Sequence, residues 1–192
     1  TGKAHQEASV TSAKLTTGQT AEIPGPKKAF LIPKPEVAAS MMNRARRVLL
    51  VVGSEALKVK TKDGDLIDTA IRMARSKRIT VAATGHISGE FRRRGAIGVH
   101  GISIMELGDR LRDPSWSGLD SGGPYDLAVF MGLPYYLEWL VLSGLKNFAP
   151  SLRTISLDNT YHPNAGWSLG YSPTEEWIEI LDRIVSNLEG VD

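Results

Sequence analysis

The sequence contains no cysteine among its 192 residues. This absence excludes disulfides, thiolate nucleophiles, cysteine-ligated zinc and cysteine-held iron–sulfur clusters within the chain. There is also no apolar run near the roughly 20 residues that are needed to cross a bilayer, and the N-terminal stretch has no apolar signal-peptide core. We therefore expect a cytoplasmic protein that does not contact a membrane.

The strong sequence signatures of phosphate and metal binding are missing as well. No G-x-G-x-x-G motif follows a predicted strand, and no G-x-x-x-x-G-K-[ST] motif occurs. The four histidines show neither H-x-x-x-H nor H-E-x-x-H spacing, and isolated histidines in polar turns are typical hydrogen-bonding residues. No pair of acidic residues stands out as an acid–base couple. We therefore predict no catalytic residues and no metal in this chain.

Acidic residues are scarce in the first half of the sequence, and basic residues are scarce in the second half. Residues 1–100 hold 18 Lys/Arg against 8 Asp/Glu, whereas residues 101–192 hold 5 against 13. The basic excess gathers in short tracts, at Arg44/Arg46/Arg47, Lys58/Lys60/Lys62, Arg75/Lys77/Arg78 and Arg92/Arg93/Arg94. These tracts fit either solvated helix ends and loops or a basic face for an anionic cofactor or an acidic partner protein. Nucleic acid is not predicted, because no aromatic residues interleave the tracts as stacking platforms would.

What the sequence does contain is an alternation of short apolar runs and helical patterns. Continuous apolar runs predict buried strands over 48–52, 79–83, 96–99, 127–131 and 152–157. Helical spacing predicts helices over 36–46, 66–75, 105–111, 136–145 and 173–188, with a short helix through Phe91. Asp65, Ser103 and Ser172 are placed as N-caps. The alternation predicts an α/β fold with an open, mainly parallel sheet of about five or six strands and helices on both faces.

The chain divides at about residue 33. Residues 1–33 lack a sustained period and end in a proline-rich stretch, which predicts an extended or partly disordered N-terminal arm. Such an arm suits docking on a partner, and disorder alone accounts for its composition equally well. Residues 34–192 are predicted to form a single α/β nucleotide-binding-like domain.

The turns that follow the predicted strands are the candidate site. In open parallel sheets, ligands bind beyond the carboxyl ends of the strands, where backbone N–H groups can hold a pyrophosphate. The candidate cofactor-binding residues in these turns are Gly53, Ser54, Thr84, Gly85, Gly132 and Asp158, with His86 and His162 as secondary candidates. Glycine also serves tight turns without any ligand, so turn geometry is the competing interpretation.

Aromatic residues gather near two of these strand ends. Tyr135, Tyr136, Trp139 and Tyr161 lie within or beside the predicted helix over 136–145 and the last polar turn. Core packing is the default explanation for them, and the alternative is stacking against an isoalloxazine ring or a protein surface.

Several segments carry a resemblance to a known family. They are RRVLLVVG (46–53), DPSWSGLD (113–120), YDLAVFMG (125–132), VLSGLKNFAP (141–150) and YHPNA (161–165). In these segments the sequence resembles the epsilon subunit of the archaeal acetyl-CoA decarbonylase/synthase complex, part of its CO dehydrogenase component. The resemblance covers most of the chain from about residue 37 onward.

The resemblance implies a fold, a partner and a role. It implies a Rossmann-like sheet of the deoxyhypusine-synthase type that binds NAD or FAD. It also implies an α2ε2 component whose large partner subunit carries the nickel and iron–sulfur clusters, in archaeal one-carbon metabolism and methanogenesis. The implied role is to stabilise that subunit or to help electrons reach FAD, and no catalytic residue is carried over. The alternatives are a dinucleotide-binding module for FAD or NAD and a free-standing enzyme of unknown reaction. In isolation the chain is expected to be capable of forming a homo-oligomer.

Overall fold

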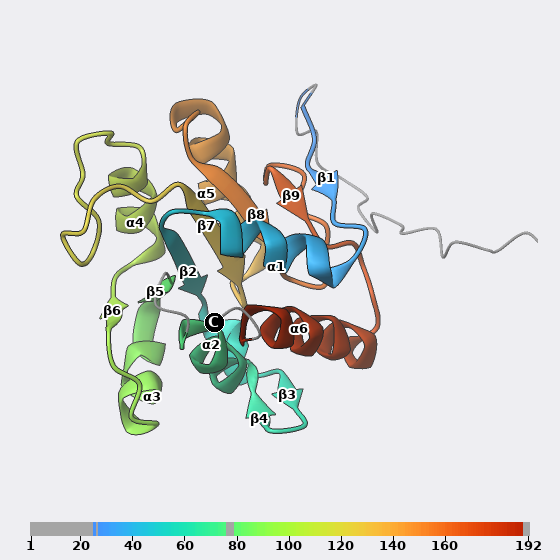
Figure 1. Ribbon diagram of the computed structural model, residues 1–192. Coiled ribbons are helices and arrows are strands. Elements are labelled where there is room, and N and C mark those ends of the chain that lie inside the picture. Colours follow the sequence, from blue (N-terminus) through green and yellow to red (C-terminus); the bar gives the residue numbers. More distant parts are fainter. Residues whose placement is uncertain (1–24, 26, 76–78, 190–192) are drawn as a thin grey trace, which may run out of the picture.

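A seven-stranded sheet in which all neighbouring strands are parallel forms the centre of the molecule (Figure 1). The computed structural model describes residues 25, 27–75 and 79–189. The strand order is β1-β9-β8-β7-β2-β5-β6. The strands are β1 (Phe30–Leu31), β2 (Val48–Val52), β5 (Ile79–Ala83), β6 (Val99–Gly101), β7 (Leu127–Met131), β8 (Arg153–Ser156) and β9 (Trp167–Ser168). A separate antiparallel pair consists of β3 (Lys60–Thr61) and β4 (Gly64–Asp65).

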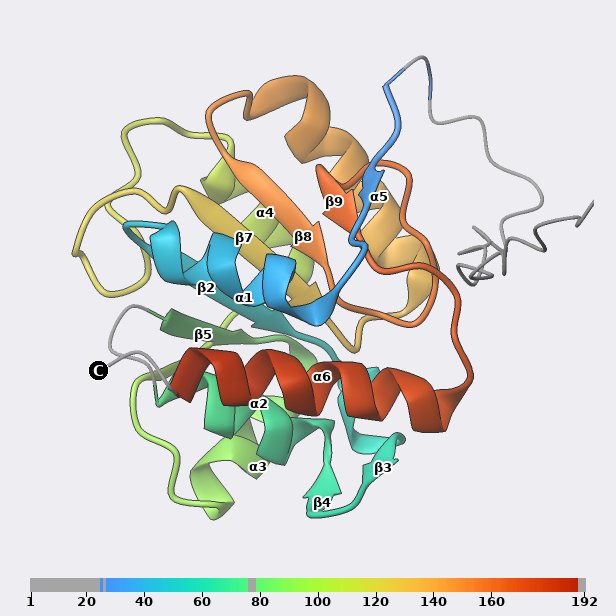
Figure 2. The same cartoon turned by 45° about the vertical axis from the view of Figure 1, so that its right-hand side comes forward.

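Helices cover both faces of the sheet, as the sequence predicted (Figures 1 and 2). One face carries α1 (Pro35–Arg44), α2 (Leu66–Ala74), α3 (Ser88–Arg93) and α6 (Thr174–Glu189). The other face carries α4 (Ile104–Leu111) and α5 (Tyr135–Phe148). Two 3₁₀ turns, η1 (Ser54–Leu57) and η2 (Gly85–Ile87), follow β2 and β5. Within the described residues, no helix combines the length and apolar character that a membrane crossing requires.

The two central strands are buried on both faces. All five residues of β2 and of β7 are buried. Alternate residues of β2 join different clusters: Val48, Leu50 and Val52 pack with the α1, α2 and α6 layer, whereas Leu49 and Val51 pack with the α4 and α5 layer. A strand that packs against apolar layers on both faces needs apolar residues at every position, so it appears in the sequence as an unbroken apolar run. The predictions over 48–52 and 127–131 are confirmed residue for residue.

The predicted helix starts follow from side-chain caps. Asp65 accepts a hydrogen bond from the N–H of Ile67 (2.9 Å) and Asp68 accepts one from the N–H of Asp65 (3.1 Å), so the capping of α2 is confirmed. Ser103 accepts from the N–H of Glu106 (3.1 Å) at the start of α4. Helix α6 begins at Thr174, one residue after the predicted start.

The sheet is larger than predicted because its far edge is built from very short strands. Strands β9 and β1 have two residues each, which is too few to carry a periodic signal. Phe30–Leu31, at the end of the predicted arm, pairs with Trp167–Ser168, while residues 1–24 and 26 of that arm lie outside the described residues. Strand β6 occupies 99–101 rather than 96–99, because Gly95 and Gly98 both have positive φ and form a turn there.

The chain reverses its direction of winding between β2 and β7. From β2 the chain proceeds to β5 and β6 on one side, and from β7 it proceeds to β8 and β9 on the other. In open α/β sheets, the crevice beyond the carboxyl ends at such a switch point is the usual ligand site. The loops after β2 and β7 therefore flank the position where a ligand is expected.

Candidate functional site

The crevice at the switch point is closed by the chain itself. Gly53 donates from its N–H to the carbonyl of Met131 (3.0 Å), and Glu55 donates to the carbonyl of Gly132 (2.9 Å). A Cβ on Gly53 would lie only 2.4 Å from the Gly132 carbonyl oxygen and 2.6 Å from Leu133. Gly53 and Gly132 thus allow two loops to pack against each other, which favours the turn-geometry interpretation of both glycines.

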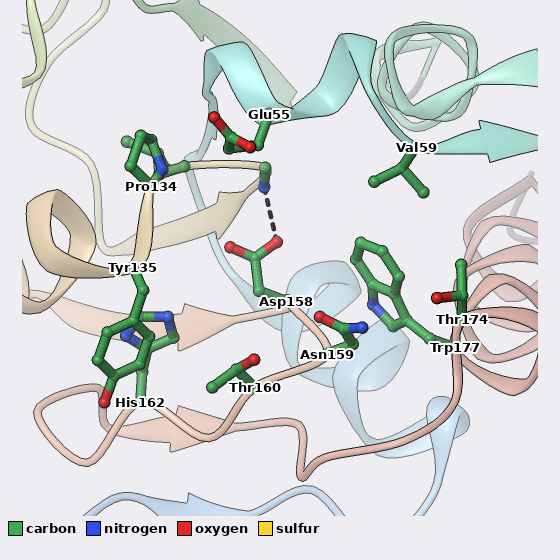
Figure 3. A pocket seen from close by; sticks show the side chains of 12 residues that line it. Glu55, Val59, Pro134, Tyr135, Asp158, Asn159, Thr160, His162, Thr174 and Trp177 are labelled. Carbon is green, nitrogen blue, oxygen red and sulfur yellow. Dashed lines mark hydrogen bonds between the residues drawn. The ribbon is translucent and has the colours of Figure 1, made fainter. Parts of the chain in front are cut away.

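The cavity that contains predicted site residues lies one strand further along, beyond the carboxyl ends of β7 and β8 (Figure 3). Its volume is about 420 Å³. It is lined by Glu55, Val59, Gly132, Leu133, Pro134, Tyr135, Asp158, Asn159, Thr160, His162, Thr174 and Trp177. Three predicted residues from distant parts of the sequence, Gly132, Asp158 and His162, meet here.

Asp158 occupies the position that an anionic ligand would take at the start of α5. Its Oδ1 accepts a hydrogen bond from the N–H of Gly132 (2.7 Å), drawn as a dashed line in Figure 3, and the N–H of Leu133 also bonds to this carboxylate. Free N–H groups at a turn that leads into a helix are the donors that bind phosphate in many nucleotide sites. Here the chain's own carboxylate already uses them.

Asp158 belongs to a buried cluster with Glu138 and His162. Glu138 lies in the first turn of α5 and is 0% exposed, His162 is 1% exposed and Asp158 is 8% exposed. One nitrogen or oxygen atom of each side chain lies within 4.8 Å of the corresponding atoms of the other two. The His162 Nε2 and the Glu138 Oε2 are 3.6 Å apart. Three titratable groups are thus gathered beside a cavity.

Burial shifts the pKa of every member of the cluster. The pKa of Glu138 is raised well above 4.5, first by burial and then by the negative charge of Asp158. Burial also raises the pKa of Asp158, although the hydrogen bonds it receives oppose that change. Burial lowers the pKa of His162 to about 4. His162 is therefore neutral at pH 7, while burial favours the protonated form of Glu138, which can donate to Asp158.

The cavity walls are aromatic, and their charges are negative. The rings of Tyr135 and His162 stack with centroids 4.4 Å apart, and Trp177 forms the opposite wall (Figure 3). The indole N–H of Trp177 donates to the carbonyl of Leu157 (2.7 Å), which fixes the ring. Glu55 and Asp158 are acidic, and no lysine or arginine is among the described residues that line the cavity. The walls therefore suit a planar ring better than a phosphate group.

The other predicted residues form a separate group at the ends of β2 and β5. Ser54 lies in η1, which contacts η2, where Gly85 and His86 are exposed. Thr84 is buried and its hydroxyl donates to the carbonyl of Val52 (3.2 Å), so it joins two strand ends. None of these described residues lines the cavity. The sequence predicted one site for all of these residues, but the fold separates them into two groups. The role of this second group in cofactor binding stays a prediction.

Several residues of the site escaped sequence reasoning. Glu138 was missed, although an acidic residue inside the apolar run YYLEWLVL (135–142) signals a buried carboxyl group. Glu55, Thr174 and Trp177 belong to loops and helices that only tertiary packing brings to the cavity.

Residues 166–170 match the G-x-S-x-G pattern of a nucleophile elbow. Its serine, Ser168, lies within β9 and is fully buried. The Ser168 hydroxyl accepts from the N–H of His162 (3.0 Å) and donates to the carbonyl of Leu169 (2.8 Å). A nucleophile elbow requires an exposed serine in a strand-to-helix turn, so this serine has a structural role.

Members of the basic tracts form ion pairs with the acidic residues of the chain. Arg94 pairs with both Asp65 (2.7 Å) and Asp68 (2.8 Å), and Arg47 pairs with Asp120 (2.5 Å). At these positions the tracts stabilise the fold.

A second cavity of about 510 Å³ lies at the end of β6 and includes His100. Glu106 and Arg110, which also line it, pair with each other (2.8 Å).

Comparison with known proteins identifies the family. A family model described as "CO dehydrogenase beta subunit/acetyl-CoA synthase epsilon subunit" matches residues 13–185. A relative from Methanothermobacter thermautotrophicus is 34% identical over 91% of this chain and 97% of its own length. Another from Methanothrix soehngenii is 34% identical over 89% and 90%. A third, from Archaeoglobus fulgidus, is 36% identical over 81% and 83%.

All three relatives are named as epsilon subunits of the acetyl-CoA decarbonylase/synthase complex. The matched residues 13–185 span the strands, the cavity loops and most of α6, so the match covers the part of the chain that forms the site described above. On this evidence the chain belongs to the CO dehydrogenase beta subunit/acetyl-CoA synthase epsilon subunit family.

Proposed function

We propose that this chain is a non-catalytic accessory subunit of the CO dehydrogenase component of an acetyl-CoA decarbonylase/synthase complex, where it stabilises a large metallo-subunit. The observation that carries the proposal is the similarity, over nearly the whole chain, to proteins named as subunits of that complex. The absence of cysteine supports it, because the thiolate ligands of nickel and iron–sulfur clusters must then come from a partner. An α2ε2 assembly is the proposed arrangement.

The outer surface of the α4 and α5 layer is the proposed contact with the partner. Large apolar side chains are exposed on these two helices, at Met105, Tyr136, Leu140 and Phe148. Tyr136 is 69% exposed and Leu140 is 48% exposed, and a spacing of four residues places them on the same side of α5. Exposed apolar groups on one surface are typical of protein interfaces, and tyrosine is enriched among the residues that dominate binding.

The test is assembly with the large nickel and iron–sulfur subunit, followed by light scattering after size-exclusion chromatography. We expect the double substitution Tyr136→Ser and Leu140→Ser to weaken association by at least roughly tenfold. The control is Ile97→Ser, which removes a 96% exposed side chain of the size of leucine from the loop before β6. Unchanged association of the double variant would reject this surface, and no association of the unmodified chain would reject the accessory role.

We propose as a second function that the cavity beside Asp158 receives the ring system of a dinucleotide, FAD before NAD, in support of electron transfer. The supporting observation is the pair of aromatic walls at Tyr135 and Trp177, beyond the carboxyl ends of two parallel strands. The Gly132 turn does not fit the pyrophosphate, because Asp158 occupies its N–H groups. The phosphates would then remain outside the cavity.

Calorimetric titration of the purified chain with FAD, NAD and NADP tests this function. Thr174 is exposed at the cavity, so Thr174→Trp should block entry and abolish binding, whereas Thr174→Ser should leave it unchanged. Ligand at about 100 times its dissociation constant should also stabilise the fold by about 2.7 kcal/mol. Absence of saturable binding to the isolated chain and to the assembled complex would reject the proposal.

A further inference from the structure

We propose that Glu138, Asp158 and His162 bind a first-row divalent metal ion, in a site that opens into the cavity beyond the carboxyl ends of β7 and β8. The site is new relative to the proposed function, and it does not depend on it. It departs from the expectation drawn from histidine spacing, because its three ligands come from helix α5, the end of β8 and the loop before β9.

The first argument is that the cluster has buried polar atoms without well-formed hydrogen bonds. Both carboxylate oxygens of Glu138 are buried and make no hydrogen bond of good geometry to any described residue, although the side chains of Asp158 and Ser156 lie close enough to interact with them. Burying a carboxylate in this way costs several kcal/mol unless something compensates its charge. The side chain of Glu138 is itself 0% exposed and lies within the cluster.

The second argument is charge. Metal coordination requires both acids to be ionised, and with His162 neutral the cluster then carries a charge of about −2, which a divalent cation would neutralise as it displaces the proton of the acid pair. No lysine or arginine lines the adjacent cavity within the described residues, so no cationic side chain is placed there to do so. An ion would also give this cavity the positive centre that its own residues lack.

The third argument is geometry and the chemistry of the donors. Two ligands that each lie 2.0–2.2 Å from a tetrahedral ion are separated by about 3.3–3.6 Å. The His162 Nε2 and Glu138 Oε2 are 3.6 Å apart, which is too long for a hydrogen bond and close to this value. One imidazole and two carboxylates suit zinc or manganese rather than calcium, which needs six to eight oxygen ligands. Asp158 and His162 line the cavity, so a water molecule can complete the coordination.

The experiment uses the full chain without an affinity tag, stripped with a chelator and then dialysed against Zn²⁺ or Mn²⁺. We expect about one bound ion per chain by elemental analysis and a raised melting temperature. Glu138→Gln removes one charged ligand while keeping its shape, and it should weaken binding by at least roughly tenfold to a hundredfold. The control is His86→Gln, because His86 is an exposed histidine outside the cluster.

Two outcomes would overturn the proposal. One is no saturable uptake of either ion by the unmodified chain, in which case the acid pair shares a proton instead. The other is unchanged uptake by Glu138→Gln with native circular dichroism, which would place the ion elsewhere. If Glu138→Gln does not fold, X-ray absorption of the zinc-loaded unmodified chain decides the question. The site requires one imidazole nitrogen and otherwise oxygen in the first coordination shell, and two or more imidazoles would reject it.

Discussion

Gly132 is the residue at which the backbone most clearly constrains the site. Its φ is +70°, and a Cβ added there would lie 2.9 Å from the nitrogen and the Cβ of Ala56. We expect Gly132→Ala to lower the free energy of unfolding by about 1–3 kcal/mol, because a left-handed conformation and a backbone clash both oppose a side chain. Urea denaturation followed by circular dichroism measures this change.

Gly144 provides a control of opposite sign. It lies inside α5, has no positive φ, and a Cβ added there would meet nothing within 4 Å. Gly144→Ala should therefore raise the free energy of unfolding by about 0.5–1 kcal/mol, since glycine weakens helix interiors by this amount. If both substitutions shifted stability in the same direction, the turn would not be under the constraint described here.

At the scale of elements, the start of α2 depends on a carboxylate that serves two partners. Asp65 caps the helix by accepting a hydrogen bond from the N–H of Ile67. It also accepts hydrogen bonds from both terminal guanidinium nitrogens of Arg94, at 2.7 and 2.8 Å. We expect Asp65→Ala to destabilise the fold by about 2–3 kcal/mol, because the cap is lost and Arg94 keeps only Asp68 and Glu90 nearby. Glu106→Ala, in the exposed pair with Arg110, should cost less than about 0.5 kcal/mol in the same urea assay.

The same carboxylate gives a pH dependence whose sign can be worked out. Burial raises the pKa of Asp65, but the hydrogen bonds from Arg94 and Ile67 outweigh burial and leave the pKa below 3.8. The folded state therefore binds its proton less readily than the unfolded state, so this stabilisation is present above pH 3.8 and is lost as pH falls below it. The stability difference between the unmodified chain and Asp65→Ala should shrink from pH 7 to pH 3. A constant difference would contradict this account.

How much the sequence can predict depends on how local the deciding forces are. Strands over 48–52, 79–83 and 127–131 could be predicted to the residue. A strand that is buried on both faces has mainly apolar residues at successive positions, and such a run can be recognised in the sequence. The two-residue strand at 167–168 could not be predicted, since it is fixed by pairing with β8 and β1 on either side. The Glu138 cluster escaped for the same reason: its members are separated in sequence, and only the tertiary fold brings their side chains together.

For the whole molecule, α6 is the element that ties the two halves of the chain together. It packs on α1 and α2, and Arg72 and Glu36 from the basic half pair with Asp182 and Arg183 of α6, each at 2.5 Å. The pairing of β2 with β7 and of β1 with β9 also joins strands from both halves of the chain in one sheet. The described residues should therefore unfold as one cooperative unit, with coincident transitions by tryptophan fluorescence and far-UV circular dichroism.

Core substitutions on opposite faces of the sheet test this cooperativity. Leu181 is buried in the layer of α1, α2 and α6, and Leu142 is buried in the layer of α4 and α5. Each change to alanine should cost about 2–5 kcal/mol and should shift both spectroscopic transitions together. If Leu142→Ala shifted one transition and left the other in place, the two layers would be independent units. The single domain predicted for residues 34–192 would then have to be divided along the sheet.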